Sequence, residues 1–116
     1  MKTHDWTRIP AEPLNPMMTR QVIHAGNITI AHLHLKKGAV VPRHSHVNEQ
    51  ITMLEQGRLR FDFDDSSQTI EAGQVMEIPP HVPHAVEALE DSLAIDVFSP
   101  VREDWLRGDD AYLRGR

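Results

Sequence analysis

Four side chains in this chain of 116 residues have the chemistry and spacing of a metal-binding site. His44 and His46 are two residues apart, and Gln50 follows four residues after the second histidine. In a regular extended strand alternate side chains share one face, so the three would point to the same side. Two neutral imidazoles and an amide oxygen on one face are suitable ligands for a divalent transition metal.

A fourth ligand is expected from a later part of the chain, and His84 is the best candidate. It ends a segment, residues 73–84, in which a glycine, a strand-like run and prolines precede the histidine. Three imidazoles and a neutral amide add no negative charge, so a bound divalent ion keeps its full charge and attracts carboxylates. We expect one divalent transition metal per chain, and the ligand types leave Ni, Zn, Mn, Fe and Co open. A histidine-lined pocket without metal is the alternative.

A second group of candidate residues comprises Asp96, Phe98 and Arg102, at the end of the last strand-like run. Alternation places Asp96 and Phe98 on one face of that strand and the apolar Ile95 and Val97 on the other. An aspartate on the inner face of a barrel is unfavourable unless it is paired or used chemically. The sequence is consistent with a salt bridge from Asp96 to an arginine such as Arg102 and equally with a catalytic role for Asp96.

The remaining histidines carry less information. His32 and His34 form a second His-x-His pair on one strand face, which could be solvent-facing or part of the barrel interior. A structural or surface role and a contact with substrate are both open for this pair. We expect His24 and His81 to be structural and His4 to have no specific role.

The elements that must position these residues are short strands. Apolar and polar residues alternate in several runs separated by Gly, Pro and Asp, most clearly where Leu59, Phe61 and Phe63 share one face. Many short strands at regular spacing indicate an all-β sandwich or barrel. The predicted strands are residues 21–24, 27–35, 50–54, 58–63, 68–71, 74–78, 84–89 and 92–98.

One domain of residues 1–116 is expected. The residue patterns at its two ends differ from the strand pattern of the central part. Residues 1–20 contain three prolines, which indicates a covering or partner-exchanged arm rather than a central strand. Residues 21–98 form the predicted barrel. In residues 99–116, serine and proline followed by acidic residues and later by glycine predict a short helix folded over an end of the barrel.

Composition excludes several classes of partner. A formal charge of −5 argues against nucleic acid, and no run approaches the ~20 apolar residues that span a bilayer. The chain has no cysteine and its first residues lack the apolar run of a secretory signal, so we expect a cytoplasmic protein. The open edges of a small barrel and the proline-rich arm favour a homodimer.

The two histidine segments resemble the two motifs of the cupin superfamily. The first has the spacing Gly38-x5-His-x-His, then Gln50, then x6-Gly, and the second has Gly73-x5-Pro with a histidine five residues on. Gln50 stands where the family usually has glutamate. The resemblance implies that the barrel is a small cupin jelly roll, to which the residues themselves add a proline-rich N-terminal arm and a short C-terminal helix.

A narrower similarity is to the KdgF-type proteins of pectin and alginate breakdown. It is carried by residues 44–50, 78–84 and 96–106, and such matches extend over most of residues 20–113. The resemblance implies that two histidines, the glutamine and the later histidine bind the metal. It also implies that Asp96, Phe98 and Arg102 act on the substrate.

The activity implied by this resemblance is the opening of 4,5-unsaturated monouronates to the linear 5-keto-4-deoxyuronate, with a small anionic sugar as substrate. Arg102 would clamp the carboxylate, Asp96 would act as general acid and base, and Phe98 would pack against the sugar. Two other functions are open. The three histidines could bind Fe(II) in an oxygenase, or the pocket could bind a sugar or metal without catalysis.

Overall fold

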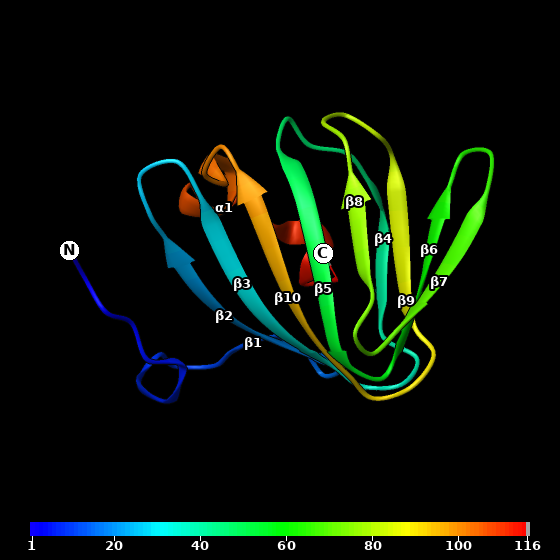
Figure 1. Cartoon of the computed structure of the whole chain (residues 1–116), viewed down its shortest axis with the longest axis horizontal. Helices are drawn as coiled ribbons and strands as arrows, with labels where there is room; N and C mark the ends of the chain where they lie inside the picture. The colour runs from blue at the N-terminus through cyan, green and yellow to red at the C-terminus, as the bar shows by residue number, and fades with distance from the viewer. Residues whose placement is uncertain (116) are drawn as a thin grey trace.

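The chain folds into two antiparallel β-sheets that face each other (Figure 1). The structure is a computed structural model and describes residues 1–115. Within these residues the strands are β1 (Glu12–Asn15), β2 (Met18–His24), β3 (Thr29–Leu35), β4 (Val40–His44), β5 (Glu49–Gln56), β6 (Arg58–Phe63), β7 (Ser67–Glu71), β8 (Val75–Ile78), β9 (His84–Ala88) and β10 (Ser92–Ser99). The helical segments are η1 (Trp6–Arg8), α1 (Glu103–Leu106) and η2 (Ala111–Leu113). None of these helices is long and apolar enough to cross a membrane.

The order of the strands is that of a jelly roll. One sheet has six strands in the order β1-β2-β3-β10-β5-β8, and the other has four in the order β4-β9-β6-β7. Strands distant in the chain, such as β3 and β10, are neighbours because the chain crosses between the sheets. The predicted all-β barrel is confirmed, as is the short helix after the last strand.

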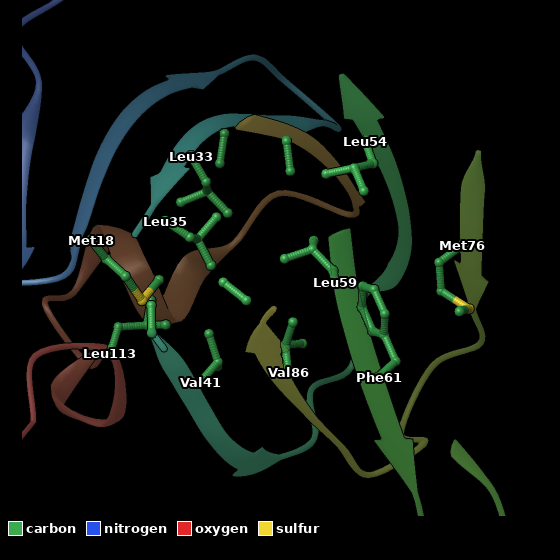
Figure 2. Packing of buried hydrophobic residues seen from close by; sticks show 14 of the residues in the cluster. Met18, Leu33, Leu35, Val41, Leu54, Leu59, Phe61, Met76, Val86 and Leu113 are labelled. Atoms are coloured by element: carbon green, nitrogen blue, oxygen red, sulfur yellow. The ribbon is translucent and has the colours of Figure 1, made fainter. Parts of the chain in front are cut away.

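The core forms where the inward residues of both sheets meet. In β6, Leu59 and Phe61 are buried while Arg58 is exposed, as the alternation predicts. Burying an aliphatic or aromatic side chain of this size stabilises the fold by about 1.5–3 kcal/mol. Figure 2 shows the core side chains pointing toward one another, among them Met18, Leu33, Leu35, Val41, Leu54, Leu59, Phe61, Met76, Val86 and Leu113.

The N-terminal region departs from the expected arm of residues 1–20. Residues 1–11 precede the first strand, and they extend from one side of the body (Figure 1). β1 and the start of β2 lie within the range expected for the arm and belong to the six-stranded sheet. β1 is an edge strand, where Pro13 is tolerated because a missing N–H need not pair. The three prolines of residues 1–20 therefore do not exclude an edge strand, and the arm is limited to residues 1–11.

The first histidine motif is not one regular strand, which was the condition for its three side chains to share a face by alternation. β4 ends at His44, residues 45–48 form a turn, and β5 follows in the other sheet. The side-chain amide of Asn48 holds the turn by donating to the carbonyl oxygen of Pro100 at 2.5 Å. The site residues of this motif converge because the chain turns between two sheets, and not because they alternate along one strand.

The C-terminal segment closes the open side between the sheets. Leu113 is buried beside Met18 (Figure 2), and its carbonyl oxygen accepts a hydrogen bond of 2.8 Å from the side chain of Asn15 on β1. Tyr112 contacts His44 at the end of β4. The segment thus joins the β1–β2 edge of one sheet to the β4 edge of the other.

Candidate metal centre

Three imidazoles converge inside one end of the barrel. The nitrogen atoms of His44, His46 and His84 that could bind one ion all lie within 4.8 Å of one another. His44 and His84 are register partners on the neighbouring strands β4 and β9. His46 reaches the same place from the turn between β4 and β5.

Backbone carbonyl groups orient all three rings. A carbonyl oxygen only accepts hydrogen bonds, so the Nδ1 atom that faces it carries the proton. The Nε2 atom of each ring then keeps its lone pair for a metal, as in metal-binding histidines generally. The three Nδ1 contacts run from His44 to Pro42 (2.8 Å), from His46 to Asn48 (3.0 Å) and from His84 to Val82 (2.8 Å).

Gln50 reaches the histidines from β5. Its Nε2 donates to the hydroxyl of Thr52 at 2.9 Å, which leaves Oε1 at 3.0 Å from Nε2 of His46. Both of these facing atoms carry lone pairs, and a cation would replace their repulsion by coordination. Nε2 of His84 is buried without a hydrogen-bond partner in residues 1–115. These side chains fit a divalent metal.

Burial keeps the imidazoles neutral. It lowers the pKa of His44 to about 4 and the pKa of His46 to about 4, and the positive charge of Arg102 adds to both shifts. Burial also lowers the pKa of His84. Neutral imidazole is the form that binds metal, so the site is in its binding form at neutral pH.

A hydrogen-bonded chain connects Gln50 to Asp96. The hydroxyl of Thr52 accepts from Gln50 and donates to Oδ1 of Asp96 at 2.6 Å. Asp96 is 8% exposed, and burial raises its pKa to about 6 against the opposing effects of the Thr52 hydrogen bond and the charge of Arg102. A carboxyl group with this pKa can exchange protons near neutral pH. Thr52 was not among the predicted residues, although it lies two residues from Gln50 on the same inward face.

Arg102 is buried but does not pair with Asp96. No hydrogen bond or ion pair joins the two side chains in the described part of the chain. Nε and Nη2 of Arg102 instead donate to the two carboxylate oxygens of Asp104, at 2.9 Å and 2.8 Å. Nη2 also donates to the hydroxyl of Tyr112 at 2.9 Å. Of the two interpretations of Asp96, the salt bridge with Arg102 is therefore wrong.

Phe98 lies between the histidines and Arg102. Its ring meets His46 edge to face, with 5.6 Å between centroids. The guanidinium of Arg102 lies 4.6 Å from the ring centroid of Phe98 and 4.3 Å from that of Trp105. Such contacts favour a cation over the ring face. Trp105 and Tyr112 belong to this cluster, and nothing in the local sequence marks them as site residues.

One small cavity connects the predicted metal and substrate residues. Its volume is about 40 Å³, and its lining includes His44, Gln50, His84, Asp96, Phe98, Arg102 and Tyr112. His46 contacts this group through Gln50 and Phe98. A surface groove of about 520 Å³ lies near the opposite ends of β3 and β10, around Met17 and Leu93; His34 lines it, and none of the predicted metal or catalytic residues does.

The other histidines lie away from the cavity. His32 and His34 face outward on β3. Nδ1 of His24 lies 2.8 Å from the hydroxyl of Thr29. His81 is exposed in the turn before β9 and has a φ of 66°, a left-handed conformation that glycine adopts more readily.

The fold resembles those of several solved structures. KdgF from Halomonas sp. is 29% identical, with a TM-score of 0.77 over 83% of this chain and 92% of that chain. An RmlC-like cupin from Shewanella frigidimarina NCIMB 400 is 25% identical, with a TM-score of 0.82 over 88% of this chain and 93% of its own. A deletion mutant of the oxalate decarboxylase OxdC from Bacillus subtilis shares the fold alone, at 18% identity and a TM-score of 0.76 over 89% of this chain and 32% of that chain. Mn(II) centres are described for that decarboxylase.

Sequence comparison gives the family. No curated protein matches this chain. The cupin domain family matches residues 31–98, which is more than half of the chain and includes both histidine segments. The chain therefore belongs to the cupin domain family.

Proposed function

We propose that this protein is a metal-dependent enzyme that opens 4,5-unsaturated monouronates, terminal products of pectin or alginate breakdown, to the linear 5-keto-4-deoxyuronate. The observation that carries the proposal is that Asp96, with a pKa raised to about 6, shares one cavity with the histidines and with Arg102. A carboxyl group that can transfer a proton, a set of side chains that fits a metal, and the positive charge of Arg102 therefore lie beside one another. The 29% identity to KdgF from Halomonas sp. supports the same assignment.

The reaction is an isomerisation. The bond between C1 and the ring oxygen breaks, the proton of the C1 hydroxyl leaves, and C1 becomes an aldehyde. The ring oxygen becomes the C5 carbonyl, and C4 gains a proton in place of the double bond. A single group that accepts a proton at C1 and delivers one at C4 balances the reaction, so no oxidant is consumed.

Asp96 is the group we assign to both proton transfers. Thr52 holds Oδ1 by a hydrogen bond of 2.6 Å, so Oδ2 is the atom available to the substrate. With a pKa of about 6, the carboxyl group is populated in both protonation states near neutral pH. A general acid and base works best when its pKa lies near the working pH.

Arg102 is the group we assign to the substrate carboxylate. Asp104 accepts from Nε and from one N–H of Nη2, and Tyr112 accepts from the other, so Nη1 is the donor left for the substrate while Tyr112 is in place. Phe98 would pack on the sugar face from its place beneath the guanidinium. A divalent metal held by the three histidines and Gln50 would supply a positive charge that polarises an oxygen ligand.

Turnover of an unsaturated uronate tests the proposal. Metal-loaded protein is incubated with unsaturated galacturonate, and the loss of the conjugated double bond is followed by ultraviolet absorbance. We expect turnover that stops after chelation and returns when metal is restored. Tight binding of the sugar with loss of the double bond at the spontaneous rate would contradict the enzyme and favour a binding protein.

A further inference from the structure

The C-terminal segment of residues 110–114 lies across the cavity that the predicted site residues share. Within it, the ring of Tyr112 stacks on His44, with 4.7 Å between centroids and 29° between planes. The Tyr112 hydroxyl accepts hydrogen bonds from Nη2 of Arg102 at 2.9 Å and from Nε1 of Trp105 at 3.3 Å. Tyr112 therefore covers a predicted metal ligand and also engages the guanidinium that we assign to the substrate.

Four charged side chains fasten this segment to the six-stranded sheet. Asp110 is 2% exposed, and its carboxylate accepts from Arg20 at 2.8 Å and from Arg114 at 3.0 Å and 3.1 Å. Glu12 on β1 accepts from both arginines, each at 2.8 Å. We call these four residues the ionic latch. Because its members come from β1, β2 and the C-terminal segment, the latch holds the segment in place over the cavity.

The cavity is small compared with the sites of organic ligands. Its volume is about 40 Å³, and the neighbouring cavity beside Gln50, Thr52 and Asp96 has about 30 Å³. Sites for small organic ligands usually measure about 300–1,000 Å³. With Tyr112 stacked on His44, the cavity has room for water or for an anion of a few atoms. A six-carbon uronate does not fit.

We propose that the segment of residues 110–114 is a displaceable cover of the metal centre and that Tyr112 determines the size of ligand that the centre admits. The closed cover admits anions of a few atoms, and a sugar acid binds when Tyr112 leaves His44 and Arg102. The Arg102 donor that Tyr112 occupies then becomes available to the ligand. The statement about sugar acids rests on the proposed function, whereas the cover rests on the geometry of the closed cavity.

Size-dependent anion binding tests the cover without turnover. In Co(II)-loaded protein the visible spectrum reports anions at the metal, with formate as the small probe and galacturonate as the large one. Tyr112→Ala removes the ring, so the affinity for galacturonate should rise by about tenfold or more because the closed state no longer competes. The affinity for formate should change by less than about threefold. Tyr112→Phe keeps the ring and should give a smaller gain for galacturonate.

Two further variants provide matched controls. Asp110→Asn weakens the ionic latch and should shift the affinities in the same direction as Tyr112→Ala. Arg107→Ala removes an exposed ion pair with Asp109, 3.0 Å long, at the same end of the chain, and should leave both affinities unchanged. Thermal unfolding and cobalt content show that each variant is folded and loaded. Equal changes for formate and galacturonate in Tyr112→Ala would overturn the cover.

Metal removal gives a second readout that involves no sugar. EDTA is larger than the closed cavity, so it should remove metal from Tyr112→Ala and Asp110→Asn at least about tenfold faster than from the parent protein. Arg107→Ala should keep the parent rate. Faster removal without turnover of unsaturated uronate contradicts the proposed function and supports the cover. An unchanged removal rate in Tyr112→Ala overturns the cover, whatever the turnover.

Discussion

The two His-x-His pairs of this chain have the same spacing and different surroundings. His32 and His34 lie on one strand, β3, and face outward, with 5.3 Å between their ring centroids. His44 and His46 lie at the end of β4 and in the turn after it, and they converge with His84 inside the barrel. Identical spacing in the sequence therefore does not decide whether a pair of histidines can bind a metal.

The convergence of the rings, and not the hydrogen bond at Nδ1, makes the difference between the pairs. Nδ1 of His32 contacts Oε1 of Gln21 at 3.2 Å, and its ring packs against Trp6. Nε2 of Gln21 donates to the carbonyl oxygens of Trp6 and Ile9, so Oε1 faces His32 and Nδ1 of that ring carries the proton. The Nδ1 atoms of His44 and His46 face backbone carbonyls in the same way, but their rings converge with His84, so three ring nitrogens can bind one ion.

The largest expected effect is on metal content. His44→Ala and His84→Ala should lose most of the roughly one metal ion per chain, because each removes one of the convergent ligands. His32→Ala and His34→Ala should keep the parent content. Elemental analysis after purification, together with thermal unfolding, measures this difference. Undiminished metal in both inner variants would place the ion elsewhere, and loss in the outer variants would remove the contrast between the two pairs.

The next largest effect concerns Asp96, on the inner face. Asp96→Asn keeps the shape but removes the titratable group, so turnover of unsaturated uronate should fall by about 10²–10⁴-fold. Metal content should stay constant, because the carboxylate is separated from Gln50 by Thr52. The outer variant His34→Ala should retain parent turnover. Near-full turnover in Asp96→Asn would mean that another group supplies the proton.

In metal-free protein, the pH dependence of the free energy of unfolding should separate the contributions of the two inner histidines from that of Asp96. His44 and His46 have pKa values lowered to about 4 from 6.5, so the native state binds fewer protons between these values and loses stability as the pH falls. Each imidazole contributes a slope of up to about 1.4 kcal/mol per pH unit, and less where solvent reaches the ring. Asp96 has a raised pKa, so the native state binds its proton more readily than the unfolded state does. This contribution to stability has the opposite sign and is lost as the pH rises through about 6.

Urea unfolding at several pH values measures this balance. The free energy of unfolding of the parent should fall between pH 6.5 and 4.5, because two imidazoles outweigh one carboxyl group. Asp96→Asn removes the opposing contribution, so its stability should fall more steeply over the same range. A parent stability that stays constant or rises on acidification would show that the inner histidines are not held neutral by burial.

The smallest effect is expected from Gln50→Glu, which adds one negative charge to the inner site. A carboxylate should keep or tighten metal binding. The Michaelis constant for an anionic sugar should rise by roughly tenfold, because the site loses part of its net positive charge. Metal titration and steady-state kinetics measure the two effects separately. Unchanged kinetics would show that the neutral amide has no electrostatic role.

Local patterns in the sequence predicted the strands well where one face is buried. Alternation of Leu59 and Phe61 with charged residues gave β6 with the bounds that the structure has. The break between β4 and β5 was not predictable in this way, because Asn48 holds the turn through Pro100, which lies 52 residues later in the chain. The outward position of Ile95 and Val97 followed from alternation as well.

The site was predictable to a similar extent. The two histidine motifs and the segment at the end of the last strand contain the predicted residues that line the cavity. Alternation along β5 from Gln50 also places Thr52 on the same inward face. Neither the role of Tyr112 nor the pairing of Arg102 with Asp104 could be inferred, since both depend on how the C-terminal segment packs against the two sheets. Contacts formed by the tertiary fold decide these positions, and local spacing does not.

Deuterium labelling tests most directly the claim that Asp96 delivers the proton in ring opening. The reaction is run in D₂O, and the product is examined early by NMR. The parent protein should place one deuterium at C4 on a single face of the carbon, because a fixed carboxyl group delivers it. Asp96→Asn should give slow product with deuterium on both faces, as spontaneous opening does. Parent product with deuterium equally on both faces, or with none at C4, would contradict the proposed role of Asp96.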